Sequence, residues 1–327
     1  MSRIFIFDVD NTLGRKTPLY PKVTSTNVGY LKQLDDDSDN LLLFATGRPR
    51  PQAKLAFTHG GLTPDQLYEV FGLGGIYEDG LFVEDGGGKV LYNAVEHAPE
   101  LFRRIKDGFF DKDAQKFFAE NGFQLFQGLR LRQNESGVTF AETYDGKGMD
   151  GTHVQHLIHS LIPLWQQGND VRETYKTPVG YMRDSLDDLE PTFERVYDVA
   201  VTYLTQRFGE KWMKAGKLER WKDAVEVYPR LDDGEDVFRK GDGIERLMQG
   251  LGVSKNTPVY VCCDGRNDIT LVRYVAERHP EYHVVCPSNV SSELKASLAE
   301  GSYRHTILDQ DCDTFTEGLA EIVAKAA

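Results

Sequence analysis

The stretch Ile4-Phe5-Ile6-Phe7-Asp8-Val9-Asp10-Asn11-Thr12 is the strongest indication of the fold class of this 327-residue chain. Its four consecutive apolar residues are typical of a strand that is buried on both faces of a parallel sheet. Two carboxylates, Asp8 and Asp10, follow where that strand ends. Because ligands bind at the carboxyl ends of parallel strands, we expect these side chains to hold a divalent cation and to carry out nucleophilic or acid–base chemistry.

The composition limits the class of partner. The net charge is -13, and 40% of the residues are hydrophobic. The length favours two globular domains. An acidic chain argues against a nucleic-acid partner, since phosphate backbones bind to an excess of Lys and Arg. A small anionic substrate then requires local screening by a metal ion or by a few positioned cations.

The sequence also predicts where the protein resides. The N-terminal residues lead directly into the first strand, and no apolar run is long enough to span a bilayer. We therefore expect a cytoplasmic protein without membrane association. The cysteines lack the CxxC spacing of a metal site, which predicts reduced, packed thiols. The oligomeric state is not indicated.

Other parts of the chain repeat the pattern of the first strand. Further buried strands are predicted at 41–45, 75–77, 258–263 and 282–286, and helices at 25–34, 242–250 and 268–278. Strands that alternate with helices predict an α/β fold with a doubly wound parallel sheet. Residues 84–235 depart from this alternation and read as an inserted α+β domain, with an apolar helical stripe that includes Leu161 and Trp165. The expected core is therefore 1–83 with 236–327.

Polar side chains that suit catalysis follow four of the predicted strand ends or helix starts. They are Asp8 and Asp10, then Thr46, then Lys240, then Asp264 and Asp268. Each has an ordinary structural explanation, because Asp and Thr often cap helices and a lysine often lies on the surface. Their placement on one edge of one sheet favours a shared site.

These motifs resemble those of the haloacid dehalogenase-like hydrolases, which are mostly magnesium-dependent phosphatases. The resemblance rests on Asp8-Val9-Asp10-Asn11-Thr12, Ala45-Thr46-Gly47-Arg48-Pro49, Arg239-Lys240-Gly241 and Asp264-Gly265-Arg266-Asn267-Asp268. It implies a Rossmann-like core with an inserted cap domain. The chain departs from the usual family pattern at Asn11 and Cys263, where glycine is common, but neither change removes a reactive group.

The resemblance also implies roles for the acidic residues. Asp8 is the expected nucleophile and would become an aspartyl phosphate, while Asp10 would protonate the leaving alcohol and later activate water. Asp264 would bind Mg²⁺ together with Asp8 and the Asp10 carbonyl. Asp268 would contribute directly or through water. Hard oxygen ligands are those that Mg²⁺ prefers.

The remaining residues of the four motifs would contact phosphate. Thr46 would hold a phosphoryl oxygen through its hydroxyl, together with the backbone N–H of Gly47. Lys240 would neutralise charge on the phosphoryl group. By the same resemblance, Arg48 and Asn267 would also bind phosphate.

The position of the insert narrows the branch of the family. Only 38 positions separate Asp8 from Thr46, whereas 194 separate Thr46 from Lys240. An insert after the third strand resembles the type II cap of the Cof-like sugar phosphatases. Glu78-Asp79-Gly80 and the segment 289–295 weakly resemble that branch too. The expected substrate is a small phosphorylated metabolite, with a sugar phosphate favoured.

Within the insert, three side chains are candidates for substrate contact, although a solvated cap sheet explains each of them better. They are Lys176, Tyr181 and Arg183. Three histidines spaced three apart, His153, His156 and His159, spread over about 120° of a helix, which favours a solvated face over a metal site.

Two other functions remain open at this stage. A phosphomutase or phosphotransferase would use the same aspartates but pass the phosphoryl group to another hydroxyl. A catalytically silent binding protein would keep the fold without the chemistry. The complete set of acidic residues and Lys240 argues against the silent protein.

Overall fold

The computed structural model divides the chain into two compact units, one of Met1–Asn93 with Arg239–Ala327 and one of Ala94–Phe238. The structure describes residues 2–16, 22–37, 39–48, 50–93, 96, 113, 116–117, 120–121, 123–125, 161–163, 197–210, 216–220, 225–230 and 239–326. The first unit includes residues 84–93, which were expected in the insert, because they extend its sheet.

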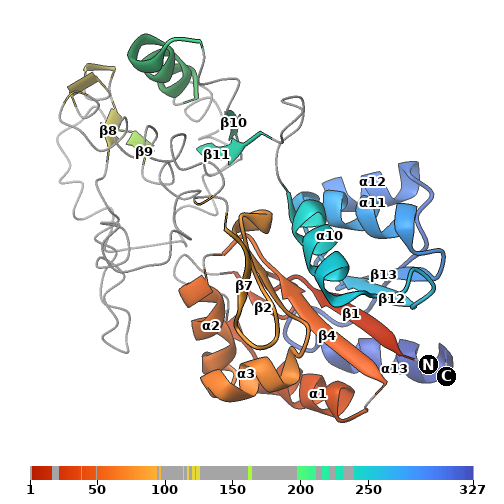
Figure 1. Cartoon of the computed structure of the whole chain (residues 1–327). Helices are drawn as coiled ribbons and strands as arrows, with labels where there is room; N and C mark the ends of the chain where they lie inside the picture. Colours follow the sequence, from red (N-terminus) through yellow and green to blue (C-terminus); the bar gives the residue numbers. More distant parts are fainter. Residues whose placement is uncertain are drawn as a thin grey trace. The chain divides into compact units, whose positions relative to one another are not determined.

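The first unit is built on one eight-stranded sheet (Figure 1). In spatial order its strands are β14 (His305–Ile307), β13 (Tyr282–Cys286), β12 (Val259–Cys262), β1 (Arg3–Phe7), β4 (Asn40–Ala45), β5 (Gly74–Tyr77), β6 (Phe82–Glu84) and β7 (Val90–Asn93). The first six pair in parallel, whereas β6 and β7 add an antiparallel hairpin to one edge. The predicted α/β fold is therefore confirmed.

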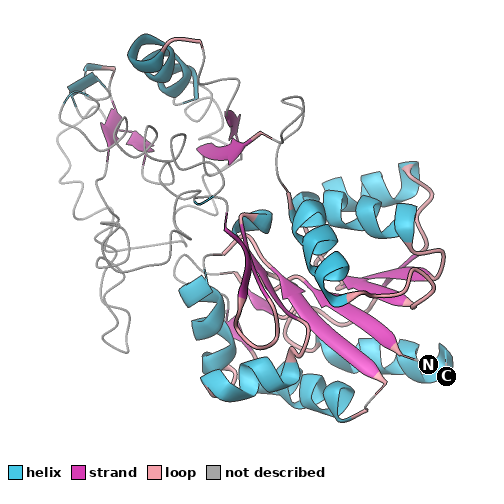
Figure 2. Cartoon of the chain, viewed as in Figure 1, coloured by secondary structure: helices cyan, strands magenta, loops and turns pink. Residues whose placement is uncertain are grey.

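Helices cover both faces of this sheet (Figure 2). One face carries α1 (Ser25–Asp36), α2 (Arg50–His59), α3 (Pro64–Val70) and α13 (Phe315–Ala326), and the other carries α10 (Lys240–Leu251), α11 (Ile269–Arg278) and α12 (Ser292–Glu300). Short elements complete the unit: β2 (Gly14–Arg15), β3 (Lys22–Val23) and the 3₁₀ turns η1 (Glu78–Gly80) and η4 (Arg266–Asp268).

The strand β1 is buried on both faces, as its apolar run predicts. Phe5 and Phe7 belong to an aromatic core, in which the ring of Phe7 meets that of Phe71 edge-on at 6.3 Å between centroids. Ile4 and Ile6 lie on the opposite face, since side chains alternate along a strand, and they are buried as well. This packing fixes the position of β1 and therefore that of Asp8, which follows it.

The described part of the second unit contains two antiparallel strand pairs. The strand β8 (Phe123–Leu125) pairs with β9 (Leu161–Pro163), and β10 (Gly216–Arg220) pairs with β11 (Val225–Pro229). A helix covers 197–208. The prediction of a helical stripe was wrong at Leu161, because that residue pairs with β8 as a strand. Lys176, Tyr181, Arg183 and the three histidines lie outside the described residues.

A search of the described helices for a stretch of sufficient length and apolarity to cross a bilayer finds none.

Candidate active site

The predicted site residues meet at the centre of the sheet. The strand β1 lies between β4 and β12, so the chain winds away from it in both directions. This is the point of an open α/β sheet at which ligands bind, beyond the carboxyl ends of the strands. Asp8 follows β1, Thr46 follows β4, and Asp264 follows β12 by two residues.

Lys240 joins the acidic side chains of the site. It is the first residue of α10, and its side chain is fully buried. Its Nζ atom donates to Asp8 Oδ1 and to Asp268 Oδ1, both at 2.6 Å, and lies 3.9 Å from Asp79 Oδ1. Burial alone would lower the pKa of Lys240, but the three carboxylates, that of Asp268 first, outweigh it and raise the pKa well above its usual range. The lysine is therefore a permanent cation.

Asp8 and Asp264 lie close together around one hydroxyl. Thr12 Oγ1 is 3.4 Å from Asp8 Oδ2 and 3.3 Å from Asp264 Oδ1. Burial, and then neighbouring carboxylates, raise the pKa of Asp264 to about 7. Burial and the charge of Asp268 likewise raise the pKa of Asp8 well above its usual range. Ionisation of both side chains is thus unfavourable unless a cation compensates their charge.

Asp10 points to a different partner. The Nε and Nη2 atoms of Arg48 donate to Asp10 Oδ1 at 3.2 and 2.8 Å, and Nε lies 3.1 Å from Oδ2. Burial would raise the pKa of Asp10, but the charge and hydrogen bonds of Arg48 outweigh it and lower the pKa below its usual value. Asp10 is therefore held as a carboxylate in this conformation.

The loop after β4 is fixed by backbone hydrogen bonds. The buried Thr46 accepts at Oγ1 from the N–H of Arg48 at 3.1 Å, and its carbonyl accepts from the N–H of Asp79 at 3.1 Å. Gly47 lies so near Asp79 that a Cβ atom there would come within 3.2 Å of Oδ1. Glycine at this position therefore lets the loop approach the end of β5 closely.

Asp268 and Asn267 lie on the turn that η4 forms before α11. The buried Asp268 accepts from the N–H of Gly265 at 3.1 Å through Oδ2, while Oδ1 receives Lys240. Asn267 Nδ2 is 3.5 Å from Asp79 Oδ1. Both oxygens of Asp268 are thus engaged, which suits a residue that positions Lys240.

Asp79 and Thr12 belong to the site but were not among the residues predicted for it. Asp79 is buried and adopts a left-handed backbone conformation with φ of 54°, which is uncommon for a residue with a side chain. The sequence did contain a pattern that indicates Asp79, because Glu78-Asp79-Gly80 follows a predicted strand as the other motifs do. Thr12 belongs to the motif Asp8-Val9-Asp10-Asn11-Thr12, and its contacts with Asp8 and Asp264 place it in the site.

The donor set fits a divalent cation. Asp8, Asp264 and Asp268 each place one carboxylate oxygen so that these atoms lie within 4.8 Å of one another. All three residues are buried, and buried carboxylates in such numbers require compensating positive charge beyond one lysine. An oxygen-only set of this kind suits Mg²⁺ rather than a softer metal.

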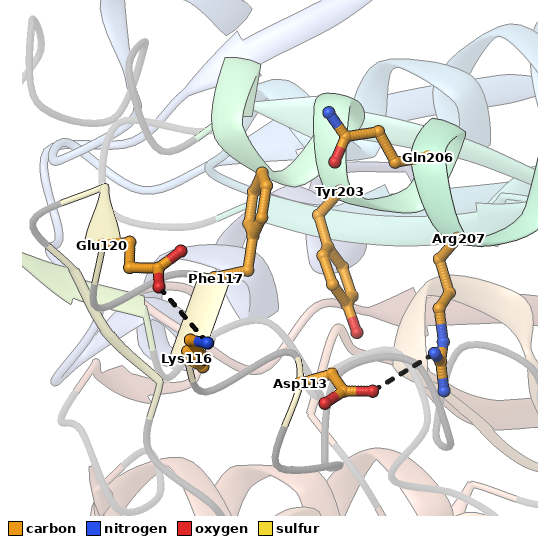
Figure 3. A pocket seen from close by; sticks show the side chains of 7 residues that line it. All are labelled: Asp113, Lys116, Phe117, Glu120, Tyr203, Gln206 and Arg207. Carbon is orange, nitrogen blue, oxygen red and sulfur yellow. Dashed lines mark hydrogen bonds and ion pairs between the residues drawn. The ribbon is translucent and has the colours of Figure 1, made fainter.

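A separate hollow lies within the second unit (Figure 3). It has a volume of about 290 Å³ and is lined by Asp113, Lys116, Phe117, Glu120, Tyr203, Gln206 and Arg207. Arg207 pairs with Asp113 at 3.5 Å and Lys116 with Glu120 at 3.8 Å, and all four side chains are exposed. Such solvated pairs contribute little energy and perturb no catalytic group. The cluster around Lys240 is therefore the better candidate for the active site.

Comparisons with known proteins agree with this geometry. A model of the family described as trehalose-6-phosphate phosphatase, C-terminal, matches residues 199–307. That match includes Lys240, Asp264 and Asp268. A search of curated proteins found no match.

Solved structures with the same fold have low sequence identity to this chain. The C-terminal domain of trehalose-6-phosphate phosphatase from C. albicans is 13% identical, with 99% of this chain and 92% of that chain covered and a TM-score of 0.53. The trehalose-6-phosphate phosphatase of Aspergillus fumigatus is 15% identical, with 99% and 93% covered and a TM-score of 0.50. A structure described as showing a trigonal-bipyramidal intermediate in a phosphoryl-transfer superfamily is 14% identical, with 100% of both chains covered and a TM-score of 0.51.

The resemblance predicted from the motifs is confirmed at the level of the fold. The chain shares the α/β fold of these solved structures, and its second unit is inserted between β7 and α10.

Proposed function

We propose that this chain is a magnesium-dependent phosphatase that hydrolyses a small phosphomonoester through an aspartyl-phosphate intermediate on Asp8. The observation that carries the proposal is the convergence of Asp8, Lys240 and Asp264 in one buried cluster at the switch point of the sheet. A nucleophilic carboxylate beside a fixed cation is the arrangement that phosphoryl transfer needs.

Asp8 and Asp264 would hold the magnesium ion, with Asp268 contributing directly or through water. When bound, the ion supplies charge neutralisation and orients the phosphoryl oxygens. Lys240 adds a second positive charge, which offsets the repulsion between the Asp8 carboxylate and the anionic substrate. The loop of Thr46 and Gly47 would receive a phosphoryl oxygen.

In the first half of the reaction, a carboxylate oxygen of Asp8 forms a bond to phosphorus while the bond from phosphorus to the leaving oxygen breaks. Asp10 gives its proton to that oxygen, so the product leaves as an alcohol. In the second half, Asp10 takes a proton from water as the water oxygen bonds to phosphorus. The bond between phosphorus and Asp8 then breaks, and inorganic phosphate leaves.

Arg48 must change partners for Asp10 to act as an acid. In this conformation Arg48 holds Asp10 ionised, which suits the second half of the reaction but not the first. A phosphoryl group is a competing anion that Arg can bind through two hydrogen bonds. We infer that substrate draws Arg48 away from Asp10 and thereby allows Asp10 to be protonated.

A sugar phosphate is the substrate class that the comparisons favour. The family model that matches residues 199–307 is described as a trehalose-6-phosphate phosphatase domain. The fold likenesses with the two fungal enzymes of that name are consistent with it. The second unit would then act as a cap that selects the sugar.

The test is hydrolysis of an aryl phosphate and of a panel of sugar, polyol and nucleotide phosphates with Mg²⁺ present. We expect turnover by the wild type, a loss of about three orders of magnitude or more in Asp8→Asn, and a 10²- to 10⁴-fold loss in Asp10→Asn. Full turnover by Asp8→Asn would refute the assigned nucleophile.

Released inorganic phosphate, followed together with product isomers, separates a phosphatase from a phosphomutase. Stoichiometric release supports hydrolysis. An isomerised sugar phosphate without free phosphate would instead support a mutase that uses the same residues.

A further inference from the structure

A further buried carboxylate, outside the cluster around Lys240, lies at the end of β6. Glu84, the last residue of β6, is fully buried and accepts four polar contacts. Its Oε1 atom receives the hydroxyl of Tyr77 and that of Tyr68, the latter at 3.0 Å, and Lys54 Nζ lies 3.7 Å away. Its Oε2 atom receives Nη1 of Arg50 at 3.1 Å.

Two of these partners are next to active-site loops. Arg50 begins α2 and comes two residues after Arg48, which binds Asp10. Tyr77 ends β5 and comes two residues before Asp79, which faces Lys240. A single carboxylate therefore ties together the chain segments that leave β4 and β5.

The same two segments are also joined at the site by backbone hydrogen bonds. The N–H of Asp79 donates to the carbonyl of Thr46 at 3.1 Å, and the N–H of Thr46 donates to the carbonyl of Ile76 at 2.8 Å. Within the first segment, the N–H of Arg48 donates to the hydroxyl of Thr46 at 3.1 Å. Asp79 also keeps a left-handed backbone conformation there. A strained turn persists only where surrounding contacts determine it. The hydrogen bonds of Tyr77 and Arg50 to Glu84 supply such contacts next to the loop and the turn.

We propose that Glu84 is a positioning residue, which fixes the loop of Thr46 to Arg48 and the turn of Asp79 through Arg50 and Tyr77. Its effect on turnover rests on the proposed function, whereas its effect on loop geometry does not. A buried ion network is weak support for stability, since apolar residues of similar volume often serve as well. A role in positioning the polar loops of the site would explain why Glu84 carries a charge at this buried position.

The two tyrosines provide a matched pair of variants. Tyr77→Phe and Tyr68→Phe each remove one hydroxyl that donates to Oε1 of Glu84, and the hydroxyl of Tyr68 also accepts from Lys54 Nζ. Tyr77 leads into the turn of Asp79, whereas Tyr68 comes from α3, which brings no site residue. Glu84→Gln removes the charge but keeps the shape, and Arg50→Lys keeps a cation on α2.

Hydrogen exchange of the Arg48 and Asp79 amides measures the positioning without any substrate. We expect exchange at both amides to speed up by about tenfold in Glu84→Gln and Tyr77→Phe but not in Tyr68→Phe. Exchange that stays at the wild-type rate in Glu84→Gln would overturn the proposal. So would equal acceleration by the two tyrosine variants, because that result would show a merely structural network.

Turnover of an aryl phosphate gives the second measurement. We expect kcat to fall by about ten- to a hundredfold in Glu84→Gln and Tyr77→Phe, with partial rescue in Arg50→Lys relative to Arg50→Met, and no change in Tyr68→Phe. A fall that follows thermal stability alone across the variants would contradict the positioning role. If the wild type hydrolyses no phosphomonoester, the proposed function fails while hydrogen exchange still decides this inference.

Discussion

At the level of single residues, Lys240 and Asp8 form one ion pair, but their charges have opposite effects on the stability of the fold. The charge of Lys240 stabilises the folded state, whereas the charge of Asp8 destabilises it. Lys240 is the cation that stands between Asp8 and Asp268, and its side chain is fully buried. Removing it leaves carboxylates buried without a partner. Removing the charge of Asp8 instead relieves repulsion in the cluster, because Asp268 still engages the lysine.

We therefore predict that Lys240→Met lowers the free energy of unfolding by about 3–5 kcal/mol, whereas Asp8→Asn keeps or raises it. Both variants lose activity. Urea denaturation in the presence of a chelator measures the difference. A stable Lys240→Met protein, or an Asp8→Asn protein that unfolds more easily than the wild type, would contradict this account.

The sequence predicted which side chains lie together in the candidate site, because they follow strand ends or begin helices. Asp8, Lys240, Asp264 and Asp268 were placed on one sheet edge and do meet there. The pairing of Arg48 with Asp10 was not predicted, because the direction of a long side chain depends on its neighbours rather than on its position in a motif.

At the level of elements, α1 is held by a buried asparagine. The Nδ2 atom of Asn27 donates to the carbonyls of Leu13 at 2.7 Å and Cys312 at 2.8 Å. Its Oδ1 atom accepts from the N–H and the hydroxyl of Thr316 at 3.1 and 2.8 Å. One side chain thus joins α1 to the start of β2 and to α13.

We predict that Asn27→Leu destabilises the protein by about 2–4 kcal/mol, because it leaves several buried polar groups without partners. The exposed Thr26 of the same helix provides the control, and Thr26→Ala should change stability by less than about 0.5 kcal/mol. Chemical denaturation of both variants measures the effect. Equal stabilities would show that water replaces the lost hydrogen bonds.

The helices and parallel strands of the first unit were more predictable than its edge. Val259–Cys262 and Tyr282–Cys286 form strands where apolar runs predicted them. The hairpin of β6 and β7 was not predicted, because the boundary expected between residues 83 and 84 divides β6 and assigns β7 to the insert. Its strands are only three and four residues long, and their place depends on pairing with β5, which the local sequence does not show.

At the level of the whole molecule, the acidic cluster links folding to pH and to metal. The folded state raises the pKa of Asp264 to about 7, above its value in an unfolded chain. Between about pH 4 and pH 7 the folded protein therefore keeps a proton that the unfolded chain has lost. Stability from this group is present at low pH and declines as the pH rises through that window. Asp8 acts in the same direction.

A divalent cation should reverse this decline, because it binds the ionised carboxylates of the folded state and not the unfolded chain. We predict that the Tm in a chelator falls by roughly 5–10 °C more between about pH 5 and pH 7.5 in the wild type than in Asp264→Asn. Millimolar Mg²⁺ should restore the wild type at the higher pH and leave Asp264→Asn almost unchanged. The difference between the two proteins isolates the cluster from the other titrating groups of this acidic chain. An identical pH response in both proteins, with no effect of Mg²⁺ on either, would mean that the three carboxylates do not form a cation site.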